Sequence, residues 1–107
     1  FGIVGLETAY ALSVTQLVDT GLLTFPELIY RMSTRPAKLL GLTALDGRGT
    51  LRKGAVADIA IANPDEKWIV DADKFKSKGK NTPFDKEFLR GRVKLTLVDG
   101  AIVGDRS

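Results

Sequence analysis

The spacing of apolar residues changes near residue 45, and this change limits most strongly what the chain can fold into. Before it, apolar side chains recur every three or four residues, as on one face of a helix. They are Leu6, Tyr10, Val14, Leu17 and Val18. After it, glycines separate short apolar stretches, which is typical of strands and turns. We therefore predict an α+β fold, with helices over 1–44 and a small antiparallel β unit over 45–107.

Start and stop signals divide the first part into three short helices. Gly21 is placed to end the first helix, because glycine readily adopts the left-handed conformation found there. Thr24 and Glu27 have the spacing of a capping box, in which each side chain bonds the other's backbone amide. The second helix should then bury Leu28, Ile29 and Met32.

A third helix is predicted to begin at a Ser33 or Thr34 cap, with Pro36 in its first turn, and to end at Gly41. The apolar faces of three such short helices exceed what they can hide in one another. The helical part is therefore expected to close the edge of a larger body, and the start of the sequence at Phe1 without a Met fits a piece of a longer chain.

The second part contains two predicted hairpins. Residues 57–62 read as a buried strand that ends at the turn signal Asn63-Pro64-Asp65, with 67–70 as its partner. Residues 92–98 alternate apolar and polar side chains, and Asp99-Gly100 is typical of a type I′ turn leading into 101–103. The segment 71–89 between the hairpins is predicted to be a long loop, and its lysines at positions 74, 76, 78 and 80 are interpreted as a solvated face.

Composition excludes several function classes. The chain has neither cysteine nor histidine, so it cannot by itself build a disulfide, a Cys–His pair, a Ser-His-Asp triad or a His-ligated metal site. A net charge of +3 is too small to indicate a nucleic-acid partner. The longest uncharged run, Thr8 to Val18, is too short for a membrane span. A reducing cytoplasm is compatible with this composition.

The glycine-punctuated stretch Phe1 to Thr8 has two interpretations. Free backbone amides where it enters a helix would form a site for a carboxylate or a carbonyl. The alternative is a simple turn between an extended segment and a helix.

Several strings together resemble the closing part of a known enzyme family. Residues 33–42 (STRPAKLLGL), 49–51 (GTL) and 54–59 (GAVADI) resemble the amidohydrolase superfamily. Within it, residues 1–8 (FGIVGLET) and 76–84 (KSKGKNTPF) resemble type I dihydroorotase. This resemblance covers essentially the whole chain, in order.

The resemblance implies a zinc hydrolase that interconverts N-carbamoyl-L-aspartate and (S)-dihydroorotate in pyrimidine biosynthesis. Residues 1–44 would form the last loop and the closing helices of a (β/α)8 barrel, and 45–107 part of a β-sandwich that includes loop 71–89. Phe1 and Gly2 match a substrate-binding pair that acts largely through its backbone. No residue of the chain matches a catalytic or metal-binding position, so the zinc ligands would lie upstream of Phe1.

The resemblance leaves other assignments open. An allantoinase or dihydropyrimidinase shares the helix and strand signatures, although these enzymes tend to have tyrosine where this chain has Phe84. A catalytically inactive dihydroorotase-like partner of aspartate transcarbamoylase is a second alternative, and a homodimer a further possible assembly. The family usually has glycine at the position of Lys86, which implies a remodelled turn there or a strained one.

Overall fold

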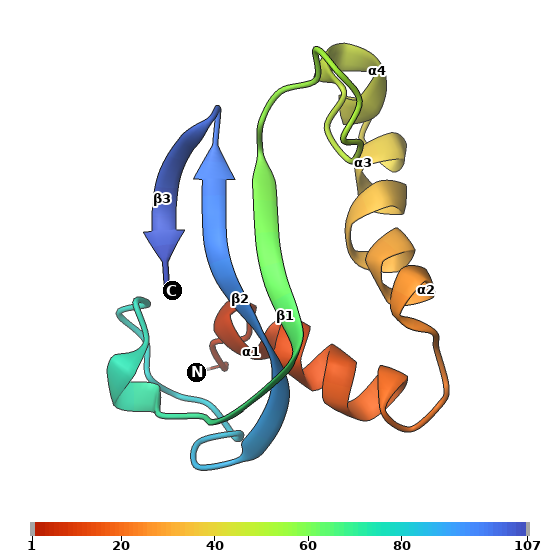
Figure 1. The fold of residues 1–107 in the computed structure, drawn as a ribbon. Helices are drawn as coiled ribbons and strands as arrows, with labels where there is room; N and C mark the ends of the chain where they lie inside the picture. Colours follow the sequence, from red (N-terminus) through yellow and green to blue (C-terminus); the bar gives the residue numbers. More distant parts are fainter. Residues whose placement is uncertain (1, 107) are drawn as a thin grey trace.

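The computed structural model describes residues 2–106 and has the predicted α+β composition (Figure 1). Its helical elements are α1 (Leu6–Ser13), η1 (Val14–Val18), α2 (Phe25–Ile29), η2 (Tyr30–Thr34), α3 (Arg35–Leu39) and α4 (Leu42–Asp46). A short 3-10 turn, η3 (Ala72–Lys74), lies between β1 (Ile59–Ile69) and β2 (Phe88–Val98), and β3 (Ala101–Asp105) follows. The strands form one antiparallel sheet in the order β1-β2-β3. In Figure 1, α1 crosses one end of the sheet and α2 to α4 run beside it on the side of β1.

Most of the predicted helix boundaries are confirmed. Gly21 and Gly41 both have left-handed backbones, with φ of 80° and 74°. The Thr24 hydroxyl caps α2 by accepting the Glu27 amide at 3.3 Å. The reciprocal half of the capping box is wrong, because the Glu27 carboxylate accepts the Thr24 hydroxyl, at 3.1 Å, and not the backbone amide. The hydroxyl therefore serves both the backbone and the carboxylate.

The predicted break before a third helix is wrong. The chain stays helical from α2 through η2 into α3, and Thr34 has helical dihedral angles with no side-chain cap. The turn η2 is a π-helix in which the Arg35 amide donates to the Tyr30 carbonyl. This wider turn precedes Pro36, which has no amide hydrogen to donate, and lets the helix pass the proline. The helical region also runs to Asp46 and ends at Gly47, not at residue 44.

The predicted pairing of 57–62 with 67–70 is also wrong, because residues 59–62 and 67–69 both belong to β1 and pair with β2. Between Asn63 and Lys67 the register shifts, so that β1 advances four residues while β2 advances only from Arg92 to Arg90. Pro64 falls in this irregular part, where its missing amide costs no ladder hydrogen bond. The turn signal therefore marks a bulge in one long strand. The type I′ turn is confirmed by φ of 49° at Asp99 and 78° at Gly100.

The core is small and lies where α1 meets the start of β2 and the segment after β1. Its buried residues are Ala11, Val70, Ala72, Phe75 and Leu89. Leu28 is buried as predicted, but Ile29 and Met32 are 38% and 42% exposed. Other large apolar side chains are more exposed still, including Leu6, Leu39, Leu40, Leu45 and Leu51. Apolar faces of this extent on helices indicate a surface made to be covered. Within residues 2–106, no helix has the length and apolar character needed to cross a membrane.

Candidate functional site

The first site feature is the extended segment that leads into α1. Gly2 has a φ of 80°, a conformation that favours glycine, and Gly5 occupies the position before the first residue of α1. The Val4 amide is not free for a ligand, because it donates to the Asn81 carbonyl at 2.9 Å. The Thr8 amide and hydroxyl both lie 3.3 Å from the Gly5 carbonyl. The segment is therefore held in place by the protein itself. Phe1, the other predicted substrate-binding residue, lies outside the described residues.

The residues that hold this segment come from loop 71–89, and we name the part formed by residues 75–81 the clamp segment. The Glu7 carboxylate accepts the backbone amides of Lys76 and Ser77, both at 3.1 Å. Asn81 bonds the N-terminal segment twice, since its side-chain amide also donates to the Gly2 carbonyl. Bonds between an ionised carboxylate and amides are stronger than neutral ones, so Glu7 is the main anchor. Loop 71–89 is thus ordered against the start of the chain.

The clamp segment is also closed on itself. Phe75 is buried in the core, and the Lys80 ammonium donates to the Phe75 carbonyl at 2.6 Å. The predicted solvated lysine face is confirmed, because Lys74, Lys76, Lys78 and Lys80 are all exposed. Lys80 nevertheless has a structural contact that the alternating pattern did not indicate.

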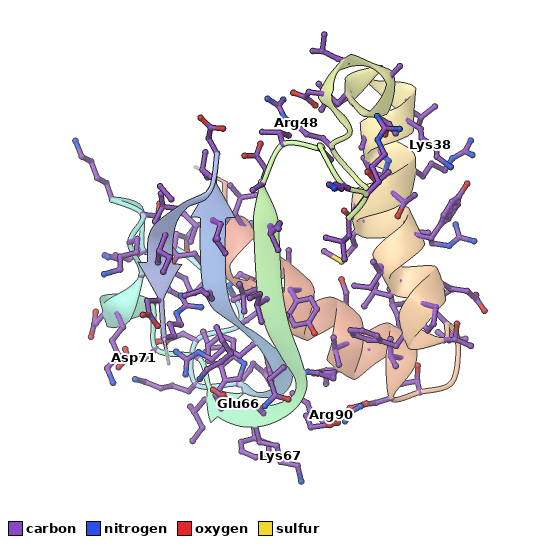
Figure 2. All side chains as sticks on the ribbon, turned by 45° about the horizontal axis from the view of Figure 1, so that its top comes forward. Lys38, Arg48, Glu66, Lys67, Asp71 and Arg90 are labelled. Carbon is purple, nitrogen blue, oxygen red and sulfur yellow. The ribbon has the colours of Figure 1, made fainter. Side chains whose placement is uncertain are left out.

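A polar cluster joins η1 to the bulged part of the sheet. The Arg90 guanidinium bonds both carboxylate oxygens of Asp19 and, at 2.5 Å, one oxygen of Asp65. The hydrogen bond with Asp19 is the largest of the effects that raise the pKa of Arg90. The Thr15 hydroxyl bonds the backbone of the same arginine, accepting its amide and donating to its carbonyl. Figure 2 shows Arg90 and Glu66 at the same end of the sheet.

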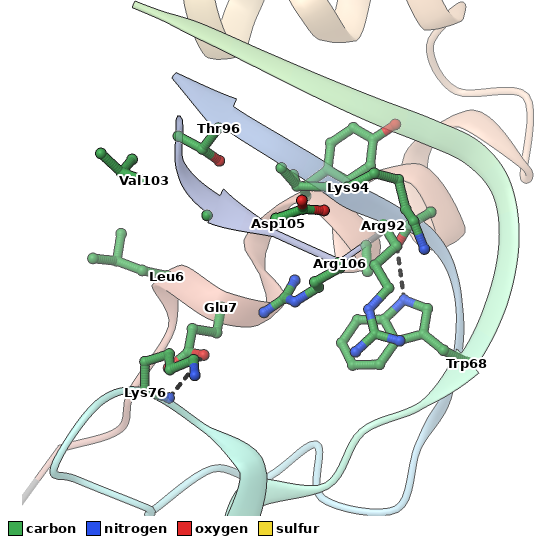
Figure 3. A pocket seen from close by; sticks show the side chains of 15 residues that line it. Leu6, Glu7, Trp68, Lys76, Arg92, Lys94, Thr96, Val103, Asp105 and Arg106 are labelled. Carbon is green, nitrogen blue, oxygen red and sulfur yellow. Dashed lines mark hydrogen bonds between the residues drawn. The ribbon is translucent and has the colours of Figure 1, made fainter. Parts of the chain in front are cut away.

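A cavity of about 440 Å³ lies between α1, the clamp segment and the strands β2 and β3 (Figure 3). Among its lining residues, the Trp68 indole donates to the Gly91 carbonyl at 2.8 Å, and the Arg92 guanidinium lies 4.7 Å from the centre of the Trp68 ring. Basic side chains, those of Lys76, Lys94 and Arg106 among them, line it together with Glu7 and Asp105. The cavity is therefore mixed in charge.

Two polar atoms at this cavity have no hydrogen-bond partner among the described residues, the hydroxyl of Tyr10 and Nε of Arg92. Burial is the main cause of the raised pKa of Tyr10, and the nearby positive charge of Arg90 opposes it. Glu66 lies close by, where a hydrogen bond from Lys94 is the largest of the effects that lower its pKa.

The described residues do not fit a zinc site. Across residues 2–106, no group of three or more His, Cys, Asp or Glu side chains is placed to hold a metal ion.

Sequence reasoning placed Gly2 in a site but missed the residues that position it. Glu7 and Lys76 are 69 residues apart in sequence, and Gly2 and Asn81 are 79 apart. No local spacing can reveal contacts over such separations. One signal did point to a contact between these parts of the chain. Residues 1–8 and 76–84 are the two segments whose sequences resemble the same family.

The fold and the sequence together define the class of this protein. A sequence profile of the amidohydrolase family matches residues 5–104, so the chain belongs to the amidohydrolase family. Among its relatives, the dihydroorotase of Syntrophus aciditrophicus is 55% identical over 102 residues, which cover 95% of this chain and 23% of that protein. The dihydroorotase of Thermoanaerobacter sp. is 50% identical over 102 residues, covering 95% of this chain and 22% of that protein.

A solved structure shows the same fold. The L-hydantoinase (dihydropyrimidinase) from Arthrobacter aurescens superimposes with a TM-score of 0.87 at 37% identity, over 99% of this chain and 23% of that one. The chain thus spans less than a quarter of the length of each of these three proteins.

Proposed function

We propose that this chain is the C-terminal part of a zinc-dependent dihydroorotase. The observation that carries the proposal is its 55% identity to a dihydroorotase over nearly its whole length. On this proposal the complete enzyme interconverts N-carbamoyl-L-aspartate and (S)-dihydroorotate for pyrimidine biosynthesis in the cytoplasm. Its zinc is held by residues upstream of Phe1.

In this proposal, residues 1–44 end a (β/α)8 barrel and residues 45–107 belong to a β-sandwich. The exposed apolar side chains of α2 to α4, such as Leu39, Leu40 and Leu45, support a covering body of this kind. The outer edges of β1 and β3 also pair with no further strand among residues 2–106, so they are open to strands from the rest of the protein.

The contribution of this chain to the reaction is to bind and orient the substrate through the backbone of Phe1 and Gly2. The positive φ of Gly2 supports this role, since it turns the peptide in a way that a side-chain-bearing residue adopts only with strain. Backbone groups held by a rigid frame bind without a further loss of conformational entropy. The chain alone is expected to be inactive, because its described residues, 2–106, contain no cluster of side chains that could hold a metal ion.

The test is an activity panel on the longer protein that carries these residues. The zinc-loaded protein should hydrolyse dihydroorotate in one direction and cyclise N-carbamoyl-L-aspartate in the other. Residues 1–107 alone, added at the same concentration, serve as the control and should show no turnover. A zinc-loaded, folded protein without either activity would contradict the proposal. If it also turned over no other cyclic amide, an inactive assembly partner of aspartate transcarbamoylase would be favoured.

The second candidate is a hydrolase of another cyclic amide, and the likeness to the L-hydantoinase (dihydropyrimidinase) fold favours it. Dihydrouracil, hydantoin and allantoin therefore belong in the same panel. Turnover of one of these without turnover of dihydroorotate would establish this alternative.

A further inference from the structure

The contacts of the clamp segment point to a residue that acts on the binding segment without touching the substrate. We propose that Asn81 is a positioning residue, which fixes the backbone of Gly2 to Val4 for substrate binding. This inference rests on the proposed function, in which Gly2 belongs to the substrate-binding pair.

Asn81 satisfies two backbone groups of that segment at once. Its carbonyl accepts the Val4 amide at 2.9 Å, and its side-chain amide donates to the Gly2 carbonyl. The bond from the Val4 amide fixes the distance between the N-terminal segment and loop 71–89. The bond to the Gly2 carbonyl fixes the direction in which that carbonyl points. Gly2 needs such a restraint, because a glycine with positive φ also reaches many other conformations freely.

The segment that carries Asn81 is itself held at several points. Phe75 anchors one end of the clamp segment in the core, and Glu7 holds the amides of Lys76 and Ser77. Gly79 passes so close to the N-terminal segment that a Cβ at this position would lie 2.9 Å from Cγ1 of Val4. Asn81 therefore holds Gly2 at a fixed place relative to the core, because only the short clamp segment separates Asn81 from the buried Phe75.

The experiment measures steady-state kinetics of the zinc-loaded longer protein with Asn81→Ala. Losing one neutral hydrogen bond should raise KM for dihydroorotate about 3- to 10-fold, with kcat changed much less. Asn81→Asp, which lacks the N–H donor, should be as impaired. Asn81→Gln, which keeps the donor on a longer arm, should recover part of the affinity. The matched control is Asn63→Ala, because the Asn63 side chain accepts a local bond from the Asp65 amide and lies in β1, away from the N-terminal segment.

A second variant keeps the chemistry of Asn81 intact. Gly79→Ala should push the clamp segment away from Val4 and raise KM in the same direction. An unchanged KM in both Asn81→Ala and Gly79→Ala, in an active enzyme, would overturn the inference.

Hydrogen exchange at the Val4 amide gives a readout that does not depend on activity. Asn81→Ala keeps the backbone carbonyl that accepts the Val4 amide but loses the side-chain bond to the Gly2 carbonyl. The segment should then open more often, so this exchange should speed up several-fold in the absence of substrate, while Asn63→Ala leaves it unchanged. Unchanged exchange in Asn81→Ala would overturn the inference by itself. A wild-type protein that turns over no dihydroorotate, with exchange that still responds to Asn81→Ala, would instead show that the proposed function has failed.

Discussion

Gly91 on β2 lies directly against Val14 on η1, so closely that a Cβ on the glycine would be 3.1 Å from Cγ2 of the valine. The same Cβ would lie 3.2 Å from a ring carbon of Tyr10. Gly91 also has a φ of 102°, which strains any residue with a side chain. The contact sets the distance between the helical layer and the sheet.

Gly91→Ala should therefore destabilise the protein, because it combines backbone strain with overpacking. We expect a loss of about 2–4 kcal/mol in the free energy of unfolding, measured by urea denaturation. Gly104→Ala is the matched control on β3, where the nearest atom to the new Cβ is 3.6 Å away. Equal stability of the two variants would contradict the packing argument.

Lys86→Gly should stabilise the protein. Lys86 has a φ of 68°, so the strained turn, one of the two alternatives that the sequence left open, is the one that the structure has. Glycine relieves this strain but also has greater conformational freedom in the unfolded chain, which offsets part of the gain. The free energy of unfolding should therefore rise by about 0.5–1 kcal/mol. Lys86→Ala is the control, since both variants lose the ion pair of 3.9 Å with Asp71. A glycine variant less stable than the alanine variant would show that the turn is unstrained.

Glu66 should make stability depend on pH in the acid range. A hydrogen bond from Lys94 lowers its pKa below the ordinary value of 4.5, and the charge of Arg92 adds to this. The unfolded state then binds the proton more readily than the folded state. The contribution of Glu66 to the free energy of unfolding is therefore fully present above about pH 4.5, and it is lost as the pH falls through the lower pKa of the folded state. The stability difference between wild type and Glu66→Gln should accordingly shrink on acidification. Glu87→Gln, at an exposed position, is the control, and a difference independent of pH would refute the prediction.

Glu7→Ala should open the clamp segment. Two amide bonds to the carboxylate are lost, at Lys76 and Ser77, and local opening becomes more frequent. Limited digestion with trypsin should cut after Lys76 and Lys78 roughly 10-fold faster than in the wild type. Glu27→Ala removes a carboxylate at the distant cap of α2 and should leave the cleavage rate at these lysines unchanged.

The parts of the fold that were predicted correctly depend on neighbouring residues. The caps at Thr24 and Gly41 and the turn at Asp99-Gly100 follow from backbone preferences over a few positions. The errors arose where tertiary structure overrode such a signal. Pro36 did not begin a new helix because a π turn accommodates it, and Asn63-Pro64-Asp65 became a bulge because both flanking segments pair with one long strand.

The candidate site was less predictable than the fold. Gly2 was predicted as a site residue through resemblance to a family, whereas Glu7 and Asn81 make contacts that join opposite halves of the chain. Burial also differed from the helical pattern, since Ile29 and Met32 are only partly covered in the described part of the protein. Exposed apolar side chains of this kind are expected where another part of a larger protein covers the helix. The spacing of apolar residues in one short helix does not show which of them such a part would cover.

The pairing of Gly2 with Asn81 has a consequence for the order of events during synthesis. The ribosome completes Gly2 well before Asn81, and 79 residues separate them. At about 5–20 residues per second, this gap corresponds to roughly 4–16 s. Throughout that interval the nascent segment at Gly2 lacks its hydrogen bonds to Asn81. It can therefore adopt the conformation described above only after the part of the polypeptide that contains Asn81 has emerged.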